Sequence, residues 1–146
     1  MFIGPLIALS LATAAPHAVP FTTVARGDGQ ASSYRTPTSL VVRDARRWRT
    51  VWRKLEPGKA PKVDFKRHML LVVVQGMQRS GGYAIEVKRV TDSGRTLTIA
   101  ADELAPGRGC ITPTVITAPY HVVRVRKADR RTRVKRTAHT SDCETS

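Results

Sequence analysis

The strongest constraint on the fold is a pair of apolar runs separated by a short glycine-bearing segment. The first run is His68–Gln75, the second is Tyr83–Val90, and Gly76–Tyr83 (Gly-Met-Gln-Arg-Ser-Gly-Gly-Tyr) connects them. Glycine enters the positive-φ conformations of tight turns without steric cost, so two such runs joined by this segment predict a β-hairpin. We therefore expect a β-rich fold organised around this hairpin.

The residue pattern inside each run predicts how its strand is buried. Met69–Val74 is continuously apolar, which is typical of a central strand covered on both faces. Tyr83–Val90 and Thr96–Ala100 alternate apolar and polar residues instead, and Asp92–Gly94 has the composition of a tight turn. The three runs together predict an antiparallel meander. Further strands are expected at Ser39–Arg43, at the proline-interrupted run Ile111–Thr117, and at Val122–Arg126.

One helix is predicted between Asp44 and Pro57. Apolar residues recur there at positions i, i+3, i+4 and i+7, which places them on one helix face; they are Trp48, Val51, Trp52 and Leu55. Asp44 stands at the N-cap, where its carboxylate can accept a bond from a first-turn amide, and Pro57–Gly58 ends the helix. The predicted fold class is mostly β (α+β), a small antiparallel sheet or sandwich-like domain with this amphipathic helix packed on it.

The ends of the chain differ in composition from its middle. Residues 1–15 form an uncharged apolar run with an Ala-x-Ala pattern, which predicts a signal peptide and hence export to the periplasm, the cell surface or the medium. The run lacks the basic residues that usually begin such a peptide, because Arg26 is the first cation. Residues 16–37 are predicted to be a flexible linker, 38–127 the folded domain, and 128–146 a basic polar tail. We expect that tail to be mostly disordered, with one short strand at Thr132–Lys135.

Charge is the unusual feature of the composition. The chain has 25 Lys and Arg against 11 Asp and Glu, a formal net charge of +14. This balance favours acidic protein surfaces, anionic polymers or anionic membranes as partners, and a genome rich in arginine codons would explain it equally well. Nucleic acid is not expected, because no aromatic stacking platform is interleaved with the basic residues.

Several short motifs recur in the order found in one known family. They are Val63–Phe65, Ser80–Tyr83, Pro106–Cys110 and Ala118–Val123, preceded by the tryptophan-bearing helix. In these motifs the chain resembles the PrcB C-terminal domain family, the protease complex subunit PrcB type, from about Ser39 to Lys127. The resemblance implies a small exported β-rich domain that assembles with a protease as an accessory subunit. The chain departs from the family pattern at Ile111–Thr114, where relatives tend to carry Thr-Gln.

The two cysteines allow two interpretations. A bridge between Cys110 and Cys143 could form in an exported protein, but its closed loop would be long and the tail would have to fold back, so the sequence favours the unpaired form. A free Cys110 thiol with His121 as its base would make a nucleophile pair, provided the two side chains met. The simpler interpretation is a cysteine that packs and a histidine at a strand end. We therefore expect no catalysis and no cofactor. We also expect no metal, because the four histidines are scattered along the sequence.

The glycine-rich segments are the predicted contact site. The hairpin Gly76–Tyr83, the loop Gly107–Cys110 and the segment Ala118–His121 are expected to cluster at one end of the sandwich, as binding loops commonly do. The candidate partner-binding residues are Arg79, Ser80, Gly81, Gly82, Tyr83, Gly107, Gly109, Cys110, Tyr120 and His121. The predicted function is a non-catalytic exported domain that binds a protein, plausibly a protease. The alternatives are a protease-inhibitor-like module, loosely similar to the chagasin type, and a basic surface that binds anionic polymers or membrane.

Overall fold

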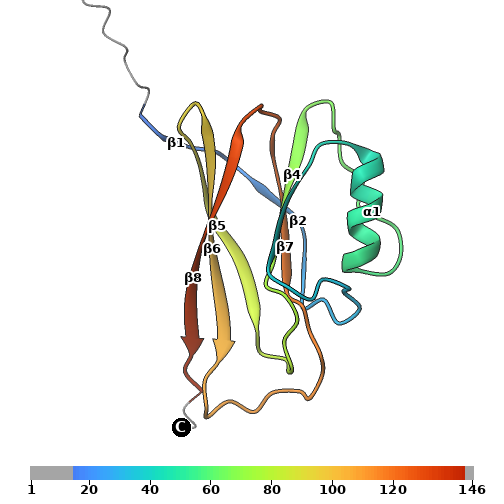
Figure 1. Ribbon diagram of the computed structural model, residues 1–146, viewed down its shortest axis with the longest axis vertical. Coiled ribbons are helices and arrows are strands. Elements are labelled where there is room, and N and C mark those ends of the chain that lie inside the picture. The colour runs from blue at the N-terminus through green and yellow to red at the C-terminus, as the bar shows by residue number, and fades with distance from the viewer. Residues whose placement is uncertain (1–14, 144–146) are drawn as a thin grey trace, which may run out of the picture.

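A computed structural model describes residues 15–143 (Figure 1). The predicted signal peptide at residues 1–15 lies outside this part, except for Ala15. No helix in the described residues has both the length and the hydropathy needed to cross a membrane. In chain order the elements are β1 (His17–Ala18), β2 (Thr22–Gly27), β3 (Thr38–Val42), α1 (Ala45–Leu55), β4 (His68–Val74), β5 (Ala84–Asp92), β6 (Thr96–Pro106), β7 (Tyr120–Arg126) and β8 (Arg131–Ser141).

The strands form two four-stranded sheets, and α1 covers the outer face of one of them (Figure 1). The first sheet has the order β1-β5-β6-β8 and the second β2-β7-β4-β3. Neighbouring strands are antiparallel except β6 and β8, which are parallel. The predicted fold class, mostly β with one packed helix, is confirmed.

Strand β4 lies at the centre of the molecule and joins two cores. Each side chain of Met69–Val74 is at most 1% exposed. Alternate residues beginning with Met69 belong to the core between the two sheets, and those beginning with Leu70 belong to the core beneath α1. Because successive side chains of a strand point to opposite faces, a strand covered on both sides must be apolar throughout. The prediction for this run is confirmed.

The helix is confirmed in its boundaries and in its buried face. The Asp44 carboxylate accepts the Arg47 backbone N–H at 2.8 Å, which satisfies one of the amides left free in the first turn. All four predicted apolar residues of the stripe are buried against the second sheet. The Glu56 backbone N–H donates to the Trp52 carbonyl and closes the last turn.

The β-hairpin predicted for His68–Gln75 and Tyr83–Val90 is wrong. β4 pairs with β3 and β7, whereas β5 pairs with β1 and β6, so Gly76–Tyr83 carries the chain from one sheet to the other. A strand that is apolar on both faces buries the most apolar surface at the centre of a sheet that is covered on both sides. The strands that flank β4 there come from distant parts of the sequence. The other half of the predicted meander, the β5–β6 hairpin through Asp92–Gly94, is confirmed.

Both segments predicted to be unstructured form strands within residues 15–143. In the predicted linker, residues 16–37, β1 pairs with β5 and β2 pairs with β7. In the predicted tail, residues 128–146, β8 runs parallel to β6 from Arg131 to Ser141, well beyond the short strand predicted at Thr132–Lys135. Edge strands bury little surface, so their residue composition predicts a strand only weakly. Their order comes from pairing with a strand that is already buried.

Arg136 shows how the basic tail is held. One of its guanidinium nitrogens donates to the Val74 carbonyl at 3.0 Å and to the Glu103 carboxylate at 2.6 Å. The other donates to the Thr38 carbonyl at 2.9 Å and to the Ser39 hydroxyl at 3.0 Å. Arg136 therefore joins β8, at the edge of the first sheet, to β3 and β4 of the second.

Candidate protein-binding site at the loop end

Three connections meet toward one end of the sandwich, in the lower part of Figure 1, and we call them the loop end: residues 28–37, 75–83 and 107–119. Backbone bonds join them. The Ala118 N–H donates to Asp28 at 2.8 Å, the Met77 N–H donates to Arg35 at 3.0 Å, and Gln78 and Thr117 exchange both bonds of an antiparallel bridge. The loop end is thus one hydrogen-bonded surface.

Two predictions about this end need correction. The strand expected at Ile111–Thr117 is wrong, because only Thr117 pairs, in the isolated bridge. The third loop of the cluster is 28–37, which was predicted to be linker, whereas most of Ala118–His121 belongs to buried structure at the start of β7. The predicted meeting of the other two glycine-bearing loops is observed.

Two glycines allow the loops to approach one another. Gly76 has φ 89° and Gly82 has φ 87°, a region that side chains with a Cβ rarely adopt. A Cβ on Gly76 would lie 2.8 Å from the Thr36 carbonyl carbon, and one on Gly82 would lie 2.8 Å from Thr112 Cγ2. Both residues therefore serve the turn and the packing between loops at once.

A disulfide joins Cys110 to Cys143. It links the loop 107–119 to the residues that follow β8, and the Gly107 N–H donates to the Ser141 carbonyl at 3.1 Å beside it. The favoured prediction of unpaired cysteines is wrong, because β8 folds back along β6 and places Cys143 next to Cys110 in the loop. The hypothesis of a Cys110 nucleophile is wrong for the same reason, since a disulfide sulfur has no thiolate to react.

His121 is 3% exposed and lies between the two sheets. Its Nδ1 accepts the Val87 N–H at 2.9 Å, so in the neutral ring Nε2 carries the proton and donates to Thr23 Oγ1 at 2.8 Å. Burial, assisted by the positive charge of Arg26 and opposed by Glu86, lowers the pKa of His121 to about 4. His121 is therefore a neutral link between β7, β5 and β2, and its predicted place on a contact surface is wrong.

Tyr120 is also buried, at 3% exposed. Its hydroxyl donates to Glu56 Oε1 at 3.0 Å, and its ring meets the Trp52 ring edge-on at 6.4 Å between centroids. Burial, together with the Glu56 carboxylate, raises the pKa of the Tyr120 hydroxyl. Tyr120 therefore fastens the end of α1 to β7, and its predicted contact role is likewise wrong.

The remaining predicted residues lie in the loop end with unequal exposure. Arg79, Gly82 and Gly109 are exposed, while Gly81 is buried beneath Pro113 and donates its N–H to the Pro113 carbonyl at 2.9 Å. Ser80, Tyr83 and Gly107 are half-buried. Exposure alone would therefore place only part of the predicted set at an interface.

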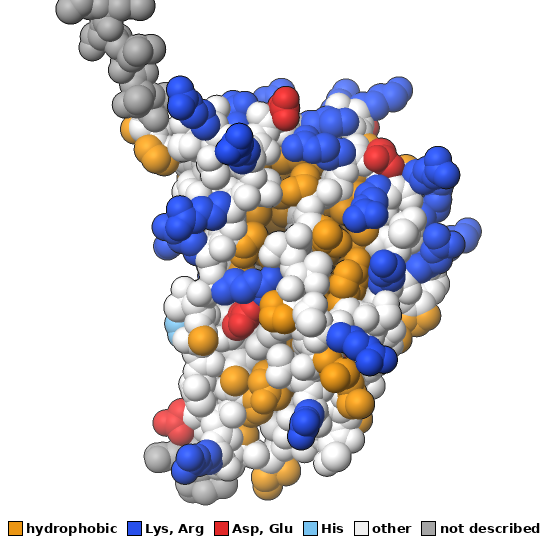
Figure 2. Space-filling model, viewed as in Figure 1, with side chains coloured by type: hydrophobic (Ala, Val, Ile, Leu, Met, Phe, Trp, Pro, Cys, Tyr) orange, Lys and Arg blue, Asp and Glu red, His pale blue; other side chains and the backbone are white. Residues whose placement is uncertain are grey.

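Sequence reasoning missed the apolar part of this surface. Among the described residues, the exposed large hydrophobic side chains are Met77 at 48%, Ile111 at 100% and Ile116 at 62%, and all three belong to the loop end. Figure 2 shows hydrophobic side chains reaching the surface at this end, whereas Lys and Arg crowd the opposite end and the side formed by α1. The β-branched run at Ile111–Thr117 predicts a strand that contains Ile111 and Ile116, and Pro113 between them is the signal against their burial.

Comparison with known proteins agrees with the resemblance in the motifs. No curated protein and no solved structure matches the chain. The family described as PrcB C-terminal matches residues 69–126, which run from β4 to β7 and include two of the three connections of the loop end. Through this segment, the chain is similar to the PrcB C-terminal family.

Proposed function

We propose that this protein is a non-catalytic, exported accessory domain that binds a protein of a protease complex through its loop end. The observation that carries the proposal is the gathering of Met77, Ile111 and Ile116, exposed, on one hydrogen-bonded surface. Single exposed apolar residues are ordinary, but the concentration of all three at one end of the molecule favours an interaction site there. Covering the fully exposed Ile111 would contribute roughly 1.5–3 kcal/mol to binding, and covering the partly exposed Met77 and Ile116 would contribute about half as much each.

The rigidity of the loop end supports the same role. Association loses free energy when mobile loops must be ordered, and loops fixed in advance avoid that loss. Here the loop 107–119 is fixed by the disulfide at Cys110 and by the bridge at Thr117, and the loop 75–83 is fixed by the same bridge. Ile111 follows the disulfide directly and is fully exposed.

Family and chemistry support the remaining parts of the proposal. The name of the PrcB family indicates assembly with a protease, which makes a protease or its complex the expected partner. Disulfides persist in oxidising compartments, so the Cys110–Cys143 bond favours export. The only nucleophile pair that the sequence suggested has no free thiol, which favours a binding role over a catalytic one.

A second candidate is a protease-inhibitor-like module, and one observation favours it. Ile111 projects from a loop whose base is covalently fixed, an arrangement suited to placing one apolar side chain in a protease cleft. An inhibitor must lower the turnover of the protease that it binds, whereas an accessory subunit need not. The two candidates therefore differ in a single activity measurement.

The test uses the chain as bait in the exported fraction of its native source, with captured proteins identified by mass spectrometry. Ile111→Asp combined with Ile116→Asp should reduce capture of the specific partner at least tenfold, because two buried apolar contacts become unpaired carboxylates. Thr132→Asp combined with Thr137→Asp makes the same charge change at exposed positions of β8 and should leave capture intact. Equal capture by both double variants refutes the loop-end site.

A captured protease is then assayed on a peptide substrate with increasing amounts of the chain. A fall in turnover that disappears in Ile111→Asp selects the inhibitor. Unchanged or increased turnover selects the accessory subunit. A partner without protease activity or protease association would refute the assignment to a protease complex while leaving the loop-end site in place.

A further inference from the structure

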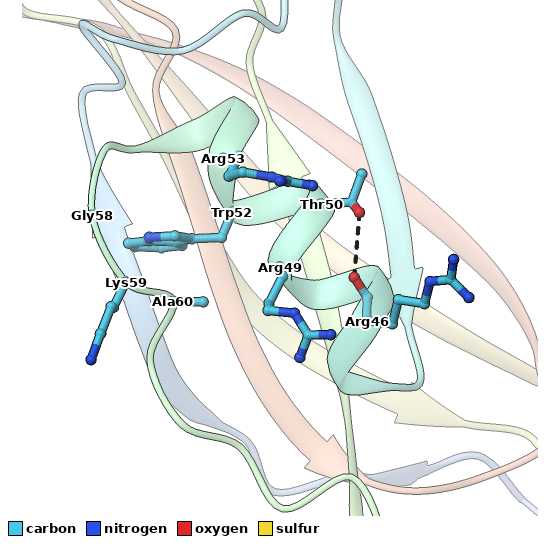
Figure 3. Close-up of a pocket in the computed structure, with 8 residues that line it drawn as sticks. All are labelled: Arg46, Arg49, Thr50, Trp52, Arg53, Gly58, Lys59 and Ala60. Carbon is cyan, nitrogen blue, oxygen red and sulfur yellow. Dashed lines mark hydrogen bonds between the residues drawn. The ribbon is translucent and has the colours of Figure 1, made fainter.

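Figure 1 shows α1 on the side of the molecule away from the β1-β5-β6-β8 sheet. A hollow lies beside this helix (Figure 3). It has a volume of about 680 Å³ and lies between α1 and the segment that follows it. We call it the α1 hollow; it is lined by Arg46, Arg49, Thr50, Trp52, Arg53, Gly58, Lys59 and Ala60. None of these residues belongs to the loop end.

The lining is cationic and contains no carboxylate. Arg46, Arg49 and Arg53 follow at i, i+3 and i+7, so their stems form one row with steps of roughly 4.5 and 6 Å along the helix axis. Lys59 comes from the following loop, and Figure 3 shows it and Arg49 on opposite sides of Ala60. Within residues 15–143, none of the four cations takes part in an ion pair.

The inner wall is apolar but offers little aromatic surface. Trp52 is only 8% exposed, and beside it stand Gly58 and Ala60, which leave room for a small side chain. The Trp52 Nε1 is buried, and no acceptor for it is found in the described residues. The hollow thus combines four cations with a small apolar floor, which matches an anionic ligand that carries a small apolar group.

We propose that the α1 hollow binds an extended acidic segment of a protein. Arginine holds planar carboxylates through paired hydrogen bonds, and alternate side chains of an extended chain stand about 7 Å apart, close to the steps of the arginine row. A small apolar side chain between two carboxylates would rest on Ala60. This inference does not rest on the proposed function, because it uses neither the loop end nor a protease.

Two other anionic partners fit the hollow less well. Single-stranded nucleic acid gains much of its affinity by stacking bases on exposed aromatic rings, and Trp52 is covered. An anionic bilayer is flat and would meet the rims of a concave site while leaving its floor uncovered. The concave shape and the small apolar floor therefore favour a narrow peptide chain.

The test measures binding of a fluorescein-labelled peptide of four Glu-Ala repeats to the full chain by fluorescence anisotropy at low and at moderate salt. Arg49→Gln combined with Arg53→Gln should weaken binding about tenfold or more, because two charge-assisted contacts are lost. Arg131→Gln combined with Arg133→Gln removes the same charge from exposed positions of β8 and should change affinity less than threefold. A third variant, Ala60→Leu, keeps every charge, fills the floor and should also weaken binding.

Each outcome decides the proposal. Equal losses in the two arginine pairs would mean that only net charge attracts the peptide, and the α1 hollow would be rejected as a site. Full affinity in Ala60→Leu would reject the floor contact and with it the proposed pose. Competition by an oligothymidine or by phosphatidylserine vesicles at lower concentration than by unlabelled peptide would replace the acidic protein segment with nucleic acid or membrane. Circular dichroism of each variant confirms that α1 is retained.

Discussion

The loop end is held together by residues far apart in the sequence, whereas the α1 hollow is built from residues 46–60 alone. The first presents Met77, Ile111 and Ile116 on a surface fixed by a disulfide and by bonds between loops. The second presents four cations on one helix and its adjoining loop. An apolar surface and a cationic surface are thus placed on separate supports of the same small domain.

The difference in support means that the two surfaces should fail independently. The loop end requires β8 to lie against β6, because only then does Cys143 reach Cys110. The α1 hollow requires the helix cap at Asp44 and the packing of the helix on the second sheet. A change that loosens one surface should leave ligand binding at the other unaltered.

The largest effect is expected from removing the disulfide with Cys110→Ser and Cys143→Ser together. The sequence separation of the two cysteines is 33, and freeing a loop of that length in the unfolded chain should lower the free energy of unfolding by about 4 kcal/mol. Urea unfolding at neutral pH measures the loss. Hydrogen exchange should show that 107–119 and the end of β8 lose protection, while α1 keeps its own and the acidic peptide still binds.

The wild-type chain under reducing conditions is the matched control, because the reductant breaks the same bond without substituting a residue. It should reproduce the loss seen in the double variant. An unfolding free energy unchanged in both would show that β8 is held by its pairing and by Arg136 alone, and the disulfide would then have no part in fixing the loop end.

The contrast between the two surfaces also explains what the sequence could predict. The helix, its cap at Asp44 and its apolar stripe follow from spacing within a dozen residues, so periodicity was sufficient. Likewise, the continuous apolar run Met69–Val74 indicated a strand covered on both faces, and that prediction holds. Features encoded by local pattern were therefore recovered with their boundaries nearly correct.

The features that were missed depend on pairing across long separations. Adjacency in the sequence predicts β5 as the partner of β4, whereas the actual neighbours of β4 are β3 and β7. The basic tail was predicted to be disordered because its sequence does not reveal that Arg136 reaches three backbone and side-chain acceptors of the other sheet. His121 was assigned to the surface because no local pattern shows that Val87, on another sheet, supplies its hydrogen bond.

An intermediate effect is expected from acid, through His121 near the loop end. The pKa of this imidazole is about 4 in the folded protein, against about 6.5 when unfolded, so the unfolded chain binds the proton more readily between these values. Stability linked to His121 is therefore complete above pH 6.5 and falls as the pH drops towards 4, by up to about 3 kcal/mol. Unfolding free energies from urea titrations at pH 7, 5.5 and 4 measure the slope.

His121→Gln isolates this contribution, since glutamine does not titrate. The variant should be less stable than wild type at pH 7, and its stability should change less between pH 7 and 4. The wild-type chain titrated in parallel supplies the reference slope. If His121→Gln keeps that slope as well, the acid sensitivity arises elsewhere and His121 is not the neutral link inferred from its two hydrogen bonds.

The smallest effect is expected on the other side of the comparison, at the N-cap of α1. Asp44→Ala removes the single 2.8 Å bond to the Arg47 amide and should lower the free energy of unfolding by about 1 kcal/mol. Because the change frays the first turn, which carries Arg46, it should lower the affinity for the acidic peptide by a few fold. Partner capture at the loop end should be unchanged. Asp44→Asn retains the cap and should restore both stability and peptide binding, whereas weakening of both surfaces in Asp44→Ala would show that α1 and the loop end are coupled through Glu56 and Tyr120.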